Sequence, residues 1–235
     1  MRPGPTIAPQ DLAAFELFAG LPSAALAEAA AVARVRMLTA DTLIFNQGDE
    51  NIRAHGLVTG SVRIIQTGGD GARSVMRFIA PGEMFGAAAL FTDGRYPADA
   101  VAITESIEAS WSEAELFELI RRHPEIAINM LRIIGKRLME AQDRVRELST
   151  QPAQRRIAHA VLRLARQAGH DTREGRAIEF PLRRKDVADI SGTTLHTVSR
   201  VLTAWEKAGI LTSHNRHLTL RLPAEIRRIA EDEAS

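Results

Sequence analysis

Residues 192–200, GTTLHTVSR, hold side chains that can bond to the edges of DNA bases. Four polar side chains in and just after this stretch recur at helical spacing and would share one helix face: His196, Ser199, Arg200 and Thr203. An arginine can donate two hydrogen bonds to a guanine, and hydroxyl groups can bond to several bases or to phosphates. These residue types predict a helix that reads DNA, with an ordinary exposed polar face as the alternative.

The residues around this stretch predict the helix-turn-helix that would position it. Ala188 is small where two helices would cross, and Gly192 can adopt the left-handed conformation that the turn needs. Val198 would anchor the second helix, and Thr193 or Thr194 could cap it. This spacing favours DNA recognition over an unspecific polar surface.

Basic residues flank the predicted motif on both sides. The sequence RRK at 183–185 would begin the first helix near backbone phosphates, and SHNRH at 213–217 would form a basic tip between two strands. The complete set of predicted DNA contacts is Arg183, Arg184, Lys185, Thr193, Thr194, His196, Thr197, Ser199, Arg200, Thr203 and Arg216.

The remainder of the chain divides into two further parts. Residues 35–110 alternate short β-rich runs with turns that contain Gly and Asp, which predicts a small antiparallel barrel or sandwich. Helical sequence returns near residue 113, and the polar stretch 149–154 indicates a boundary. We therefore expect a β-rich domain at 1–112, a long helix within 113–149 and a DNA-binding domain at 150–235.

The predicted long helix carries an apolar seam of two interleaved seven-residue series. Its members are Leu131, Ile134, Leu138, Ala141, Val145 and Leu148. Such a seam is typical of two helices that pair in a homodimer, although a seam this short could also pack on the core of its own chain.

Composition excludes several classes of protein. Cysteine is absent, which excludes disulfides, thiolate metal sites and cysteine-bound iron–sulfur clusters. No apolar run is long enough for a membrane helix, so we expect a cytoplasmic protein without a membrane partner. Acidic residues exceed basic ones before residue 150 and basic residues exceed acidic ones after it, which suits a C-terminal polyanion partner. No Gly-rich phosphate loop or metal-spaced cluster points to an enzyme.

The order of these parts resembles the CRP/FNR superfamily of bacterial transcription regulators. PGEMFGAAALF at 81–91 looks like the start of the family's ligand cassette, and RRHPEI at 121–126 looks like the entry to its dimerisation helix. The resemblance implies an α+β fold with a double-stranded β-helix jelly-roll sensor, a long dimerisation helix and a C-terminal winged helix-turn-helix. It also implies a homodimer on a palindromic double-stranded DNA operator, with RNA polymerase as a further partner.

The cassette departs from the branch of the family that binds cyclic AMP. That branch has a glutamate and an Arg-Ser pair where this chain has Ala87, Pro97 and Ala98. A buried phosphate without a partner would be costly, so we predict that cyclic AMP is not the ligand. The predicted sensor pocket consists of Phe85, Gly86, Ala87, Arg95, Tyr96, Pro97 and Ala98.

GRYPA at 94–98 and TVSR at 197–200 look like the cysteine-free, nitric-oxide-responsive (NNR/DNR-like) branch. That resemblance implies haem, for which His55 or His123 would be the axial ligand in the sensor. It also implies a TTG-type half-site that Arg200 reads, with altered preference at the base pair facing His196, because FNR-like proteins have glutamate there. The alternatives are a regulator with a vestigial pocket and no ligand, or a β-domain attached to an enzyme or channel.

Overall fold

The computed structural model describes residues 6–231, so the outermost ends of the two predicted terminal domains lie outside the described residues. The chain forms two compact units, Met1–Arg73 with Arg77–Glu140 and Ser74–Met76 with Ala141–Ser235. The division falls inside the long helix α4, Glu125–Thr150, whose end coincides with the polar stretch at 149–154. No helix among residues 6–231 has the length and apolar character needed to cross a membrane.

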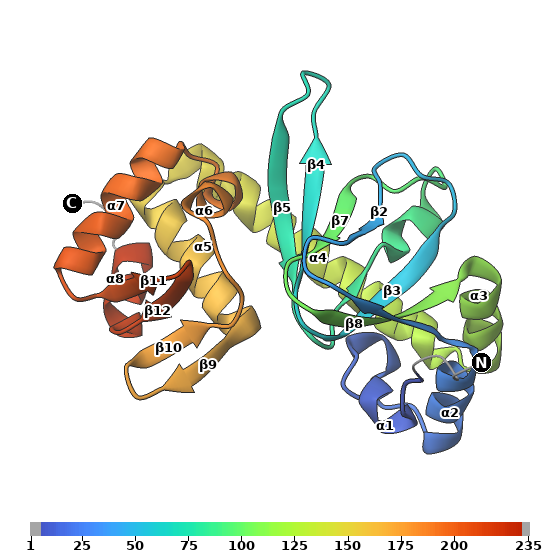
Figure 1. Ribbon diagram of the computed structural model, residues 1–235. Coiled ribbons are helices and arrows are strands. Elements are labelled where there is room, and N and C mark those ends of the chain that lie inside the picture. The colour runs from blue at the N-terminus through green and yellow to red at the C-terminus, as the bar shows by residue number, and fades with distance from the viewer. Residues whose placement is uncertain (1–5, 232–235) are drawn as a thin grey trace. The chain divides into compact units, whose positions relative to one another are not determined.

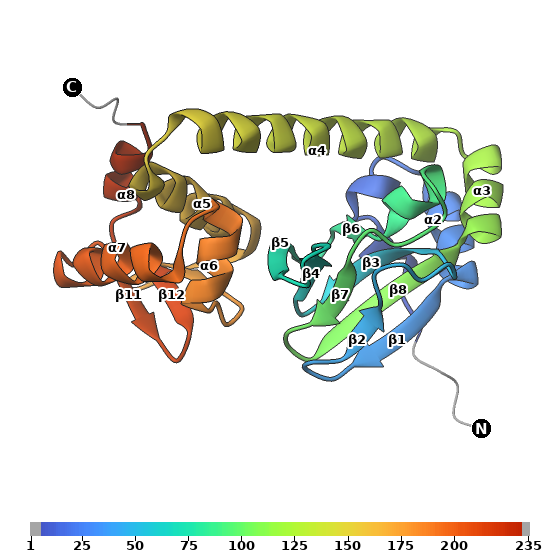
Figure 2. The same ribbon diagram turned by 90° about the horizontal axis from the view of Figure 1, so that it is seen from above.

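Residues 34–112 form two four-stranded sheets, which make a β-sandwich (Figures 1 and 2). One sheet has the strand order β1-β8-β3-β6, with bounds Arg34–Leu38, Ser106–Ser112, Arg53–Thr59 and Met84–Phe85. The other has the order β2-β7-β4-β5, with bounds Leu43–Phe45, Asp99–Ala102, Val62–Thr67 and Arg73–Ile79. The prediction of a small β-rich barrel or sandwich is confirmed, because these strands form a sandwich.

Each face of the β1-β8-β3-β6 sheet has its own core, because neighbouring side chains of a strand point to opposite faces. Helices α1 (Pro9–Leu12), α2 (Ser23–Val32) and α3 (Glu113–Arg122), together with the 3₁₀ turn Glu16–Phe18, supply apolar residues to one core. Trp111 is fully buried in this core and donates from Nε1 to the carbonyl of Ala29 at 2.9 Å. The other core contains Phe45, Leu57, Val62, Ile79, Phe85 and Tyr96, with the short 3₁₀ helix Ala87–Phe91 beside it.

Helices α3 and α4 begin at recognisable sequence signals. The hydroxyl of Ser112 accepts from the backbone N–H of Glu115, and the Glu115 carboxylate accepts from the N–H of Ser112, which is a capping box. Pro124 lies one residue before the start of α4. Buried Asn129 ties α4 to the N-terminal segment, because its Nδ2 donates to the carbonyls of Leu17 and Ala19.

After the end of α4, the described part of the second unit contains four further helices and a four-stranded sheet. The helices are α5 (Ala153–Ala168), α6 (Arg184–Ser191), α7 (Leu195–Lys207) and α8 (Pro223–Glu231). The sheet has the order β11-β12-β10-β9, with bounds Leu211–His214, His217–Leu220, Gly175–Ile178 and Gly169–Thr172. Strands β9 and β10 pair as an antiparallel hairpin, in which Gly175 takes a φ of 134° and Arg176 donates to the carbonyl of Ala165.

Candidate DNA-binding surface and sensor pocket

The turn between α6 and α7 has the geometry that the sequence predicts. Gly192 follows α6 with φ 61° and ψ 43°, the left-handed conformation that glycine adopts without strain. The N–H of Thr193 donates to the carbonyl of Ala188 at 3.0 Å, which closes the end of α6. From α5, Arg156 donates to the carbonyls of Ser191 and Gly192, a contact that the sequence motif did not reveal.

Thr194 is the residue that caps α7. Its Oγ1 accepts from the backbone N–H of Thr197 at 3.1 Å, so the structure decides between Thr193 and Thr194. The Thr197 hydroxyl lies 2.9 Å from the same oxygen and belongs to the cap. The buried stripe of α7 consists of Val198, Val201, Leu202 and Trp205.

The opposite side of α7 presents the side chains that the sequence predicts as base readers. His196 and Arg200 are exposed, and Ser199 and Thr203 are half-buried between them and the core stripe. Within residues 6–231, the side chains of His196 and Arg200 have no hydrogen-bond or ion-pair partner. Both groups are therefore available to an external partner.

Arg184 has a different position from the one the sequence suggests. Its guanidinium donates to the Ser199 carbonyl and the Thr203 hydroxyl, each at 3.0 Å, and pairs with Glu206 at 3.3 Å. These bonds join α6 to α7, so Arg184 and the Thr203 hydroxyl are engaged within the protein rather than free for DNA. Of its neighbours in the RRK stretch, Lys185 pairs with Asp189, and Arg183 is exposed.

The predicted wing is a tight hairpin of β11 and β12. Asn215 and Arg216 form its tip with φ values of 48° and 68°, the pattern of a two-residue type I′ turn. The Arg216 side chain is exposed, while its carbonyl accepts from the N–H of Leu182 at 2.7 Å. The wing is thereby fastened to the segment that leads into α6.

All six seam residues of α4 are exposed in the single chain. The exposed fractions of Leu131, Leu138 and Val145 are 68%, 59% and 64%. This is the result expected for a seam that awaits a partner and not for one packed on its own core. Leu148 also lies against Gly192, where an added Cβ would meet its Cδ2 atom.

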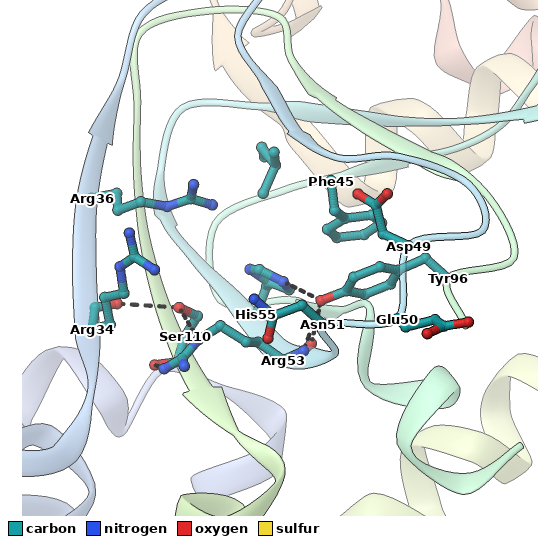
Figure 3. A pocket seen from close by; sticks show the side chains of 11 residues that line it. Arg34, Arg36, Phe45, Asp49, Glu50, Asn51, Arg53, His55, Tyr96 and Ser110 are labelled. Atoms are coloured by element: carbon teal, nitrogen blue, oxygen red, sulfur yellow. Dashed lines mark hydrogen bonds between the residues drawn. The ribbon is translucent and has the colours of Figure 1, made fainter. Parts of the chain in front are cut away.

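In the sandwich, His55 is the centre of a buried polar network (Figure 3). The residue is only 3% exposed and lies within β3. Its Nδ1 is 3.0 Å from Glu108 Oε2, and its Nε2 is 2.9 Å from the Tyr96 hydroxyl. Glu108 also accepts from Arg36 Nε at 2.6 Å.

The network fixes the charge states of its members. Burial lowers the pKa of His55, and the facing Glu108 carboxylate offsets this only in part. Burial alone would raise the pKa of Glu108, but its bonds to His55 and Arg36 outweigh that effect and hold the pKa below its usual range. Glu108 is therefore ionised, and neutral His55 donates from Nδ1 because a carboxylate can only accept.

A pocket of about 290 Å³ opens beside this network. Arg34, Arg36, Arg53, His55 and Ser110 line it from β1, β3 and β8, and Ile44 and Phe45 supply an apolar part from β2. The rest of the lining consists of Tyr96 and residues 49–51. Most of these residues were not predicted, although alternate charged residues in RVR (34–36) and RAH (53–55) place them on one strand face.

The seven predicted sensor residues are scattered around this pocket. Tyr96 lines it, with its ring stacked on Phe45 at a centroid distance of 3.7 Å. Gly86 lies behind the network, where a Cβ would be 2.9 Å from His55 Cδ2. Phe85, Ala87 and Ala98 are buried, whereas Arg95 and Pro97 are exposed and Arg95 pairs with Glu50.

The two sensor histidines do not fit an axial role for haem. Both ring nitrogens of His55 are bonded within the protein, so an iron would have to displace Tyr96 or Glu108. His123 lies at the end of α3 rather than at the start of the long helix, does not line the pocket, and bonds from Nε2 to Glu28 at 3.2 Å.

The arrangement of a β-sandwich, a long helix and a helix-turn-helix defines a DNA-binding regulator with a CRP-like fold. Residues 35–123 match the cyclic nucleotide-binding domain, and residues 155–229 match the Crp-like helix-turn-helix domain. The chain belongs to the CRP/FNR family of transcription regulators, whose members bind DNA as dimers, and not to a family of enzymes.

Named relatives support this assignment. The chain is 32% identical to the cyclic AMP receptor protein of Thermus thermophilus, over 80% of this chain and 83% of the relative. It is 33% identical to the nitrogen fixation regulation protein FixK of Azorhizobium caulinodans, over 77% and 74%. The structure of FixK2 from Bradyrhizobium japonicum superimposes with a TM-score of 0.74 at 25% identity, covering 86% of this chain and 100% of that one.

Proposed function

We propose that this protein is a homodimeric regulator that binds a palindromic DNA operator through α7 and is controlled by a small ligand in its sensor. The observation that carries the proposal is the face of α7, where exposed His196 and Arg200 have no partner in the described part of the chain. Thr194 and Gly192 hold this helix in a fixed direction, so the unpaired groups are presented together.

Arg200 is the proposed reader of a guanine. Its guanidinium can donate to O6 and N7 of that base, which predicts a half-site of TTG type. Exposed His196 would face a neighbouring base pair, where a ring nitrogen that carries a proton can donate but cannot accept. We therefore expect the operator preference to differ from that of FNR-like proteins at the position of His196.

Backbone phosphates would be contacted by Arg183, Lys185 and the wing residue Arg216. Arg183 and Arg216 are exposed, and the Lys185 ammonium lies at the surface although it pairs with Asp189. Such contacts strengthen binding to any DNA sequence and weaken as salt rises. Arg184 would contribute to recognition indirectly, because its bonds to the Ser199 carbonyl and the Thr203 hydroxyl position α7.

Two-fold pairing through the α4 seam would set the spacing of the two half-sites. The test replaces Leu138 with glutamate, which puts a charge at the centre of the seam. The matched control is Met139→Glu, since Met139 is also exposed on α4 but points about 100° away. We expect Leu138→Glu to give monomers in sedimentation and to lose preference for a palindrome over one half-site, while Met139→Glu stays dimeric. Dimers of Leu138→Glu would refute the seam.

Ligand control is supported by the pocket beside His55. Haem and nitric oxide, which the branch resemblance implies, fit this geometry poorly because the nitrogens of His55 are engaged. A Soret band in freshly purified protein would support haem despite this geometry. Cyclic AMP remains unfavoured, since Ala87, Pro97 and Ala98 carry no group for a ribose or a phosphate, and similarity to a cyclic AMP receptor protein does not supply one.

A further inference from the structure

We infer that the pocket beside His55 is a binding site for a small organic anion, whose carboxylate or phosphate oxygens bond to the guanidinium groups of Arg34, Arg36 and Arg53. Binding of the anion does not depend on DNA recognition, whereas its role as an effector rests on the function proposed above.

Strand register brings the three arginines to one place. Arg34 lies opposite Ser110, and Ser110 lies opposite His55, so these residues form one row across β1, β8 and β3. Arg36 is two positions along β1 from Arg34 and Arg53 is two positions along β3 from His55, so all four side chains share the face of the sheet that lines the pocket. Like charges gathered in this way favour an anion between them.

The protein itself neutralises these arginines incompletely. Arg36 donates from Nε to Glu108. Arg53 donates from Nε to the Ser110 hydroxyl and from Nη2 to Glu115. The Arg34 guanidinium has no partner among the described residues. None of the guanidinium nitrogens of these three residues is buried without a partner, so those left over face the pocket or solvent.

The acidic residues of the lining are turned to other partners. Asp49 accepts from the backbone N–H of Asn46 at 2.9 Å, and Glu50 pairs with Arg95. In Figure 3, Asp49 and Glu50 lie on the side of the pocket opposite Arg34 and Arg36. An anion would therefore place its charged end against β1 and β3, away from these carboxylates.

The remaining walls indicate an organic body on the ligand. Ile44 and Phe45 form an apolar surface, and the volume of about 290 Å³ is at the lower end of the range for small-molecule pockets. Guanidinium groups bind both carboxylate and phosphate through paired hydrogen bonds, so either oxyanion suits the arginine end.

The experiment is calorimetric titration of the full-length protein with inorganic phosphate, phenyl phosphate and benzoate. We expect saturable binding of at least one probe with one site per chain. If the phosphates bind, phenyl phosphate should have a lower dissociation constant than inorganic phosphate, because its ring contacts the apolar wall. Benzoate binding alone would identify a carboxylate site, and binding of the two phosphates alone a phosphate site.

Arg34→Ala is the decisive variant, because Arg34 is exposed and supports no other side chain. We expect it to weaken binding about tenfold or more, the usual loss for a charge-assisted hydrogen bond. Arg34→Glu should abolish binding, whereas Arg121→Ala, an exposed arginine on α3 outside the pocket, should bind as the unmodified protein does.

The inference is overturned if no probe binds saturably, if Arg34→Ala binds as tightly as the unmodified protein, or if Arg121→Ala weakens binding equally. Operator binding is measured separately on the same proteins without any anion. If the unmodified protein binds the operator but no anion, the pocket inference alone is refuted. If it binds an anion but no operator, the DNA-binding proposal alone is refuted.

Discussion

The exposed face of α7 and the inner face of the β1-β8-β3-β6 sheet both carry polar side chains. They differ in whether those side chains have hydrogen-bond partners within the protein. On α7, His196 and Arg200 have no partner in the described residues. On the sheet, His55 uses both ring nitrogens and Glu108 bonds to two neighbours. An exposed polar group is solvated by water, whereas a buried one must be paired within the protein.

This difference shows how to find groups available to a ligand in each region. On the surface helix, the free side chains themselves mark the candidate interface. In the sandwich, His55 and Glu108 bond within the protein, whereas the Arg34 guanidinium at the pocket has no partner among the described residues. The two regions can be followed separately, because Trp111 is buried in the first unit and Trp205 in the second. Each variant whose stability is measured is therefore compared with a parent that retains only the relevant tryptophan.

The largest expected effect is in the sandwich. Glu108→Ala leaves Arg36 and His55 without their shared acceptor, and breaking a buried pair in this way costs about 3 kcal/mol of unfolding free energy. Urea denaturation followed by Trp111 fluorescence measures the loss. The control is Glu118→Ala, since Glu118 pairs with Arg121 on the surface of α3, where ion pairs contribute little. Equal losses of unfolding free energy in the two variants would show that the buried network contributes no more to stability than the surface ion pair does.

A smaller effect is expected at the turn of the second unit. Gly192→Ala puts a Cβ into a left-handed residue, at a cost of about 1–2 kcal/mol, and brings it against Leu148. The control is Gly209→Ala, which shares a positive φ of 70° but has no neighbour within 4 Å of the added Cβ. Urea denaturation followed by Trp205 fluorescence should show a larger loss for Gly192→Ala, and a Leu148→Ala background should remove the excess. A larger loss for Gly209→Ala would contradict this account of the turn.

The smallest effect is a pH dependence of the stability of the sandwich. The pKa of His55 is lowered in the folded protein, so below pH 6.5 the unfolded chain takes up a proton that the folded chain refuses. Stability should fall as the pH decreases from 6.5, by at most about 1.4 kcal/mol per pH unit, until the lowered pKa is reached. The lowered pKa of Glu108 acts in the same direction below pH 4.5. Denaturation of His55→Gln followed by Trp111 fluorescence should lack the decline that His55 causes below pH 6.5, whereas a decline from His159 on α5, whose pKa burial also lowers, belongs to the second unit. An unchanged Trp111 profile would exclude His55 as the cause.

The sequence predicted the geometry of the helix-turn-helix better than the lining of the pocket for a physical reason. The turn at Gly192, the cap at Thr194 and the face of α7 depend on neighbours within a few residues, so spacing alone reveals them. The pocket unites β1, β3 and β8, whose meeting depends on strand register across the whole sandwich. The α6–α7 contact of Arg184 was missed for a similar reason, because it becomes visible only when the two helices are packed.

The most direct test of the central account is equilibrium binding of Arg200→Ala to a palindromic TTG-type operator and to a duplex with the guanine replaced. The unmodified protein should prefer the operator, and Arg200→Ala should lose about 1–3 kcal/mol of binding free energy on it while binding both duplexes alike. His217→Ala, an exposed wing residue outside the predicted contacts, serves as the control and should retain the preference. If Arg200→Ala still discriminates between the two duplexes as strongly as the unmodified protein does, the proposal that Arg200 on α7 reads the base sequence is wrong.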